Sequence, residues 1–212
     1  MFPPKQLWVV IPAKPLREGK SRLASALSAE ARRELTRHFI QRTLAVVLSV
    51  TELAGVVVVS RDGEILALAE AAGAQVLPET GSGMLATVAE EWGLNRAVGQ
   101  AASFVGSKGG DGLLFLPTDL PLLAADDIRT LAAAWDGREK CAVLAASQDG
   151  GTNALLLSPP DAIAPAFGVG SFARHLRLAD ERGLAVALVE SEGLAWDVDT
   201  PEEYRRMAGI PE

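Results

Sequence analysis

Short, wholly apolar runs alternate along the chain with longer segments in which apolar residues recur at helical spacing. The runs at residues 56–59 and 113–116 are apolar at every position, which is typical of strands that are covered on both faces. Strands that alternate with helices in this way are typical of an α/β fold with a mostly parallel sheet. We therefore expect strands at residues 7–11, 56–59, 75–77, 112–116, 141–145, 154–157 and 185–189.

Residues that favour helix ends lie between these strands. The sequence T-P-E-E places Thr200 at an N-cap, Pro201 at the first helical position and Glu203 where it completes a capping box. Gly73 can end a helix over residues 64–72 in a left-handed conformation. Asp62 and Gly63 lead into that helix, and by similar signals we expect helices that begin directly after Ser28, Asp126 and Ser171.

Residues 79–110 are rich in Gly and Ala. We expect a helix between two loops there, and one interpretation is a lid over a site. Gly81, Gly83 and Ala86 match the pattern G-x-G-x-x-A. However, residues 78–80 separate this match from the preceding strand, whereas a dinucleotide-binding motif opens a helix directly after its strand. We therefore treat the match as accidental.

The composition predicts one globular domain over residues 1–212. Of the 212 residues, 49% are hydrophobic and 22% are charged, which excludes a disordered chain. The 20 Lys and Arg against 27 Asp and Glu give a net charge of -7, which argues against a nucleic-acid partner. The apolar runs are far shorter than the roughly 18 residues of a membrane span, and a signal peptide is not visible. We expect a cytoplasmic protein without a membrane partner.

A basic loop follows the first strand. Lys14, Arg17, Lys20 and Arg22 lie within a short stretch of an otherwise acidic chain. The G-K-S at residues 19–21 ends like a Walker A loop, but Lys14 stands where that loop requires glycine, so a P-loop NTPase is not expected. Two interpretations remain open: a solvated basic loop, or a loop that neutralises a triphosphate.

Carboxylates follow two other predicted segments. Asp119 lies just past the apolar strand at 112–116, where open α/β sheets bind their ligands. Asp197 and Asp199 are two residues apart, so in an extended segment both side chains project to the same face. Asp119 could instead form a turn, and Asp199 could belong to the start of a helix. Together the three carboxylates suit Mg²⁺ on a nucleotide, because Mg²⁺ prefers oxygen ligands.

Two glycine-rich segments are candidates for anion binding. They are D-G-G-T-N at residues 149–153 and F-G-V-G-S at residues 167–171. Glycine lets the backbone approach a ligand, and the second segment opens a helix, where N–H groups favour an anion. An ordinary turn and a helix cap are the alternatives. We expect His38 to be solvated, and a contact of His175 with a ligand stays open.

In their order along the chain, these segments resemble a known family. They are P-A-K-P-L with K-S-R-L, G-L-N-R-A at 93–97, L-P-T-D-L-P-L, D-G-G-T-N-A-L-L-L, F-G-V-G-S-F-A-R-H and D-V-D-T-P-E-E. The combination resembles the phospholactate/phosphoenolpyruvate guanylyltransferases of coenzyme F-420 biosynthesis over nearly the whole chain. The resemblance implies a single-domain, three-layer α/β sandwich of the nucleotide-diphospho-sugar transferase type, with a mostly parallel sheet.

The resemblance also implies a role for each matching residue. The carboxylates that would bind Mg²⁺ are Asp119, Asp197 and Asp199. The residues that would bind the phosphate of the acceptor are Thr152, Gly168 and Ser171. The residues that would contact the nucleotide are Lys14, Lys20, Ser21, Arg22 and Asn95. Of these, Asp119 and Lys20 would act directly in catalysis. The chain has extra residues at 80–93 relative to the family pattern, and their role is left undefined.

The implied reaction transfers GMP from GTP to a phosphate oxygen of phosphoenolpyruvate or 2-phospho-L-lactate, with release of pyrophosphate. The product would pass to a downstream transferase of the same biosynthesis. One alternative is a nucleotidyltransferase for another phosphorylated acid, such as 3-phosphoglycerate, or for a sugar. A second alternative is a non-catalytic nucleotide-binding module, against which the three aspartates argue. The oligomeric state, with a homodimer as one alternative, is left open by the sequence.

Overall fold

All seven strands expected from the sequence are present. The computed structural model describes residues 5–80 and 89–209, so the glycine match at 81–86 lies outside the described residues. Each strand begins and ends within two residues of its expected bounds. The strands are β1 (Leu7–Pro12), β2 (Gly55–Ser60), β3 (Gln75–Pro78), β4 (Gly112–Phe115), β5 (Cys141–Ala146), β6 (Thr152–Ser158) and β7 (Ala185–Leu188).

Helices alternate with these strands as expected. They are α1 (Ala29–Leu48), α2 (Gly63–Ala72), α3 (Ala89–Ser107), α4 (Ala125–Trp135), α5 (Ser171–Glu181), α6 (Glu192–Ala195) and α7 (Pro201–Ala208), with a short 3-10 helix, η1 (Ser21–Ser25). The sequence did not predict η1 or α6. They have five and four residues, which is too short for an apolar stripe of helical period to show.

The strands form one mixed, mostly parallel sheet in the order β3-β2-β1-β4-β6-β5-β7. Only β6 among the described strands is reversed, because it pairs antiparallel with both β4 and β5, while the other pairs are parallel. The reversal has a consequence for function. The first residue of β6, Thr152, pairs with Ala146 at the end of β5, so β6 begins at the edge where its neighbours end.

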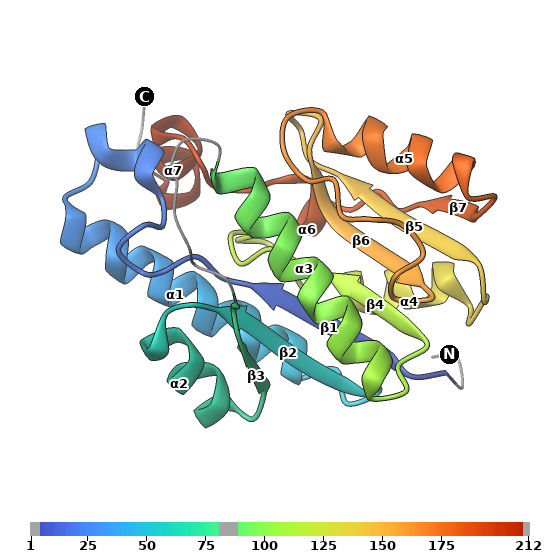
Figure 1. Ribbon diagram of the computed structural model, residues 1–212. Coiled ribbons are helices and arrows are strands. Elements are labelled where there is room, and N and C mark those ends of the chain that lie inside the picture. Colours follow the sequence, from blue (N-terminus) through green and yellow to red (C-terminus); the bar gives the residue numbers. More distant parts are fainter. Residues whose placement is uncertain (1–4, 81–88, 210–212) are drawn as a thin grey trace.

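Helices cover both faces of the sheet in a three-layer sandwich (Figure 1). On one face, α1, α2 and α4 pack against alternate strand residues such as Val9 and Leu114. On the other face, α3 and α5 pack against the residues between them, such as Val10 and Phe115. This burial on both faces explains why the strands are apolar at every position.

The caps at Ser28, Asp62 and Thr200 form as expected, and Gly73 ends α2 at φ 98°. Two other helix starts were predicted wrongly. The N-cap of α4 is Ala124, not Asp126, and the carboxylate of Asp127 accepts the N–H of Ala124 at 2.8 Å. An Asp at any position of the first turn stabilises a helix start, so the presence of Asp126 and Asp127 does not show which residue is the N-cap.

Ser171 does not precede α5 but is its first residue, and the N-cap is Gly170 at φ 67°. This left-handed conformation is one that glycine adopts without steric cost. The hydroxyl of Ser171 is therefore not used as a helix cap.

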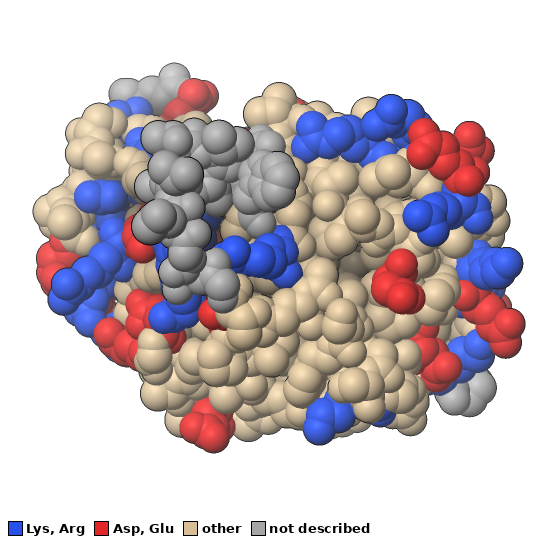
Figure 2. Space-filling model, viewed as in Figure 1, with Lys and Arg blue, Asp and Glu red and all other residues tan. Residues whose placement is uncertain are grey.

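The surface carries charges of both signs. On the face shown in Figure 2, Lys and Arg side chains alternate with Asp and Glu around the rim, with a mainly uncharged area between them. In the described part of the chain, none of the helices has the length and apolarity needed to cross a bilayer.

Candidate active site

The predicted site residues gather at the edge of the sheet where the parallel strands end. The basic loop follows β1, Asp119 follows β4, and Thr152 begins the reversed strand β6. The segment with Asp197 and Asp199 is attached to this edge, because Val198 N donates to Asp119 O at 3.2 Å. Open α/β sheets bind their ligands at this edge, so the fold brings these residues together where a ligand site is expected.

Lys20 lies between two of the carboxylates. Its Nζ donates to Asp119 Oδ2 at 2.6 Å and to Asp199 Oδ1 at 3.1 Å. The side chain is only 7% exposed, and Nζ lies 5.5 Å from the centre of the Phe39 ring. Lys20 itself adopts a left-handed conformation at φ 54°, which is uncommon for a residue with a side chain. The loop thus holds one ammonium group inside the carboxylate cluster.

Burial and the carboxylates act in opposite directions on Lys20. Burial alone disfavours the charged ammonium, but the attraction of Asp119 and Asp199 outweighs it, so the pKa of Lys20 is raised. Lys20 therefore remains a cation, available to neutralise negative charge at this position.

The carboxylate of Asp197 is buried close to two other carboxylates, and its pKa is raised. Burial, and then repulsion by Asp119 and Asp199, raise the pKa of Asp197 to about 6. The amide of Asn153, with Nδ2 3.5 Å from Asp197 Oδ1, acts weakly in the opposite direction. The three carboxylates are thus close enough to repel one another, and a further cation nearby would stabilise their ionised forms.

The donor chemistry of this cluster fits Mg²⁺, since all three side chains offer carboxylate oxygens. As the side chains stand, no group of three or more Asp, Glu, His or Cys residues within 5–80 and 89–209 is arranged to hold a metal ion. Lys20 Nζ takes the position between Asp119 and Asp199. Binding of Mg²⁺ would therefore require these carboxylates to exchange the ammonium for the metal ion.

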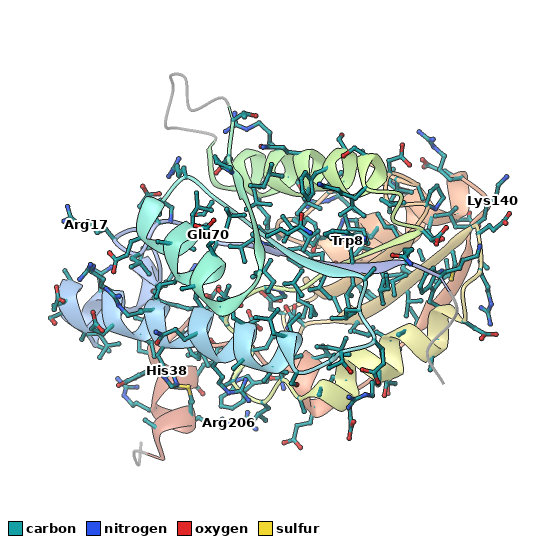
Figure 3. The ribbon with its side chains drawn as sticks, turned by 90° about the horizontal axis from the view of Figure 1, so that it is seen from below. Trp8, Arg17, His38, Glu70, Lys140 and Arg206 are labelled. Atoms are coloured by element: carbon teal, nitrogen blue, oxygen red, sulfur yellow. The ribbon has the colours of Figure 1, made fainter. Side chains whose placement is uncertain are left out.

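Arg22 reaches the carboxylates from the same loop as Lys20. Arg22 Nη1 lies 3.3 Å from Asp199 Oδ2, and its side chain is 70% exposed. Lys14 and Ser21 are exposed on the same loop, and Arg17 points away from the sheet (Figure 3). Lys20 and Arg22 are thus brought to the site, whereas contacts of Lys14 and Ser21 with a nucleotide stay predictions. His38 is exposed, as expected, on α1.

The three residues predicted to bind the acceptor meet at the start of α5. Thr152 Oγ1 and Ser171 Oγ are 3.1 Å apart, and both residues are buried. Ser171 N donates to Gly168 O at 2.9 Å, and Gly168 has φ 121°, a conformation open to glycine. A pair of hydroxyl groups beside a glycine-rich turn is a suitable cradle for a phosphate.

Asn95, on α3, holds the glycine-rich turn from the other side. Its Oδ1 accepts from Phe167 N at 2.7 Å, and its Nδ2 donates to Phe167 O at 3.3 Å. Both ends of the amide are thus used on one backbone residue. The predicted contact of Asn95 with a nucleotide stays a prediction, and the structure adds a role in shaping the turn.

Two further polar residues lie at the site: Asn153, which the sequence did not single out, and His175, for which it left a ligand contact open. Asn153 is 6% exposed and donates from Nδ2 to Leu194 O at 2.9 Å, which ties β6 to the segment before Asp197. His175 is 0% exposed and contacts Thr152. A buried polar side chain requires hydrogen-bond partners. For Asn153, the one available signal was a polar residue at the start of an otherwise apolar strand.

A hollow of about 250 Å³ opens beside the carboxylates. Its lining residues are Arg22, Gln148, Asp149, Trp196, Asp197, Asp199, Thr200 and Glu203. A larger hollow of about 510 Å³ lies between the ends of β5 and β7 and shares Gln148 with it. None of the predicted site residues lines the larger hollow, so the smaller one is the better candidate for a nucleotide.

Comparison with solved structures identifies the fold. A solved structure described as a putative nucleotide-diphospho-sugar transferase from Desulfovibrio desulfuricans is similar, with a TM-score of 0.71, 16% identity, and 92% of this chain and 83% of that chain covered. A 4-diphosphocytidyl-2C-methyl-D-erythritol synthase from Anaerococcus prevotii has a TM-score of 0.63 at 14% identity, with 97% of each chain covered. The fold is that of the nucleotide-diphospho-sugar transferases.

The sequence defines the family within this class. The chain belongs to the family described as "Guanylyl transferase CofC like", whose model matches residues 7–208. A phosphoenolpyruvate guanylyltransferase of Sphaerobacter thermophilus is 38% identical over 200 residues, with 94% of this chain and 91% of the relative covered. A 2-phospho-L-lactate guanylyltransferase of Methanocaldococcus jannaschii is 31% identical over 199 residues, with 92% and 79% covered. The resemblance inferred from the motifs is confirmed.

Proposed function

We propose that this protein transfers GMP from GTP to the phosphate of phosphoenolpyruvate and releases pyrophosphate. The observation that carries the proposal is the convergence, at one edge of the sheet, of two different sites. One is the Lys20 ammonium among three carboxylates. The other is the Thr152–Ser171 hydroxyl pair. The first suits a nucleotide triphosphate and the second suits the phosphate of a small acid.

The attacking group requires no general base. A phosphate oxygen of the acceptor is already ionised near neutral pH, so the reaction depends on orientation and on neutralisation of charge. His175 agrees with this mechanism, because both of its ring nitrogens are engaged within the protein. Lys20 and Arg22 supply positive charge next to the position proposed for the nucleotide.

Asp119, Asp197 and Asp199 would hold Mg²⁺. When bound, the ion would neutralise charge on the α-phosphate and on the leaving pyrophosphate. Asn153 supports this arrangement, since it holds the backbone before Asp197 and approaches the carboxylate itself.

Phosphoenolpyruvate is the favoured acceptor because the relative of that name is more similar to this chain than the one named for 2-phospho-L-lactate. Thr152, Gly168 and Ser171 would bind its phosphate. The product would contain an activated phosphoanhydride, which suits a downstream transferase as the next enzyme. A homodimer stays a prediction, which sedimentation analysis of the purified protein can test.

Pyrophosphate release tests the proposal. The protein would be assayed with GTP and Mg²⁺ against phosphoenolpyruvate, 2-phospho-L-lactate, 3-phosphoglycerate and unphosphorylated pyruvate. We expect turnover with phosphoenolpyruvate, none with pyruvate, and loss of turnover with EDTA that added Mg²⁺ restores. Turnover with 3-phosphoglycerate alone would reassign the acceptor, and no turnover with any acid would contradict the enzyme function.

A further inference from the structure

His175 has a fixed pattern of hydrogen bonds inside the protein. Ala166 N lies 3.0 Å from Nε2, and Thr152 Oγ1 lies 3.0 Å from Nδ1. A backbone N–H can only donate, so Nε2 must accept and carries no hydrogen. The single hydrogen of a neutral imidazole then lies on Nδ1 and is donated to Thr152 Oγ1.

The neutral form of His175 is the form that this environment favours. The side chain is 0% exposed, and the edge of its ring contacts Phe167, with ring centres 4.8 Å apart. Burial, and then the neighbouring charge of Arg174, lower the pKa of His175 to about 4. The neutral ring described above is therefore present at physiological pH.

The tautomer of His175 determines whether the Thr152–Ser171 hydroxyl pair can donate a hydrogen bond to a ligand. Thr152 Oγ1 accepts from His175 and is 3.1 Å from Ser171 Oγ. One hydroxyl hydrogen satisfies the contact between Thr152 and Ser171, and the other is left to donate outward. With the opposite tautomer, Nδ1 would accept the hydrogen of Thr152, and the hydrogen of Ser171 would satisfy Thr152. Only lone pairs would then face a ligand, and these repel a phosphate.

The backbone group that sets the tautomer is itself held in place. Arg174 donates to Ala166 O from Nε at 3.1 Å and from Nη2 at 3.0 Å. Asn95 holds the next residue, Phe167, through both ends of its amide. The N–H of Ala166 is thus fixed relative to the ring of His175.

We propose that His175 is a positioning residue, which turns the Thr152–Ser171 hydroxyl pair into a hydrogen-bond donor for the phosphate of the acceptor. This rests on the proposed function, because it assumes that the pair binds that phosphate. His175 acts through Thr152 and does not contact the acceptor itself. The acceptor site would then select groups that accept hydrogen bonds, such as a phosphate dianion.

Steady-state kinetics of two His175 variants test the proposal. His175→Phe keeps an aromatic ring against Phe167 and removes both nitrogens. We expect the KM for phosphoenolpyruvate to rise by roughly tenfold or more, while the KM for GTP changes by less than about twofold. His175→Asn can return an N–H donor near Thr152 and should recover part of the loss. The matched control is His38→Phe, at an exposed histidine, which should change neither constant.

A double-mutant cycle with Thr152→Val separates the proposal from a purely structural role. Valine keeps the branched shape of threonine in β6 but lacks the hydroxyl. If His175 acts through that hydroxyl, the double variant should have about the same KM for phosphoenolpyruvate as Thr152→Val alone. Independent, multiplicative effects would overturn the positioning role. A Thr152→Val protein with an unchanged KM would instead contradict the acceptor site on which the proposal rests.

Nitrogen NMR of the wild-type protein provides a test that requires no variant to fold. The chain has two histidines, so ¹⁵N-labelled histidine gives two sets of ring signals, and the exposed His38 serves as the internal reference. We expect His175 to have a protonated Nδ1 and an unprotonated Nε2 at pH 7. A hydrogen on Nε2 would overturn the proposal.

Discussion

Lys20 Nζ lies 2.6 Å from Asp119 Oδ2, although the two residues are 99 positions apart in the chain. The ion pair is mostly buried, with side-chain exposures of 7% and 22%. Removal of one partner from a buried pair leaves the other charge uncompensated. Each partner can therefore be tested by a substitution that keeps the shape of the side chain.

Lys20→Met should weaken the use of GTP. Methionine keeps a long aliphatic stem near Phe39 but removes the charge. We expect kcat/KM for GTP to fall by a factor that corresponds to about 1.5–3 kcal/mol, the usual loss for a charge-assisted contact. Lys5→Met is the control, because Lys5 lies outside the carboxylate cluster and pairs with the exposed Glu139, at 3.6 Å. If Lys20→Met and Lys5→Met both left kcat/KM for GTP nearly unchanged, the interpretation of a solvated basic loop would be favoured.

Asp119→Asn and Asp197→Asn should each lower turnover by roughly 10²-fold or more, because they remove charge that would hold Mg²⁺. Each variant should also need more Mg²⁺ for half-maximal activity. Asp126→Asn is the control, since Asp126 has a 92% exposed side chain on α4. Near-normal activity in a variant with an unchanged melting curve would show that the residue is not a metal ligand.

Ser171→Ala should raise the KM for phosphoenolpyruvate far more than the KM for GTP. Gly170 is the N-cap of α5, so alanine at 171 removes the hydroxyl without the loss of a helix cap, and a melting curve should show only a small change. Initial rates would be measured with both substrates varied. A rise confined to the KM for GTP would assign Ser171 to the nucleotide.

His175 should make the protein less stable in acid. Burial lowers its folded-state pKa from 6.5 to about 4, so the unfolded chain binds a proton below about pH 6.5 that the folded chain does not bind. The free energy of unfolding therefore decreases as the pH falls from 7 to 5, by about 2 kcal/mol from this group alone.

Urea unfolding of wild type and His175→Phe at pH 7 and pH 5 measures this effect. The raised pKa of Asp197 contributes in the opposite direction, but both proteins keep Asp197, so their difference reports on His175. The variant should lose less stability on acidification than the wild type. The same pH dependence in both proteins would mean that His175 titrates normally.

The sequence was sufficient to predict the strands and most helix ends, because these depend on local patterns. Runs such as residues 56–59 are apolar at every position and form a strand covered on both faces. The caps at Ser28 and Thr200 depend on residues within three positions of one another. The start of α4 was missed because Asp126 and Asp127 both suit a first turn, and only the backbone geometry shows which carboxylate is used.

The motifs of the sequence also identified the family and the residues at the edge of the sheet, but not their partners. Only the tertiary structure decided that Lys20 lies between Asp119 and Asp199. It also decided that the hydroxyl of Ser171 contacts Thr152 instead of capping α5. The reversed direction of β6 brings Thr152 to this edge. These features depend on contacts between distant segments and on the removal of water from charged groups. Neither is encoded in the local alternation of apolar and polar residues.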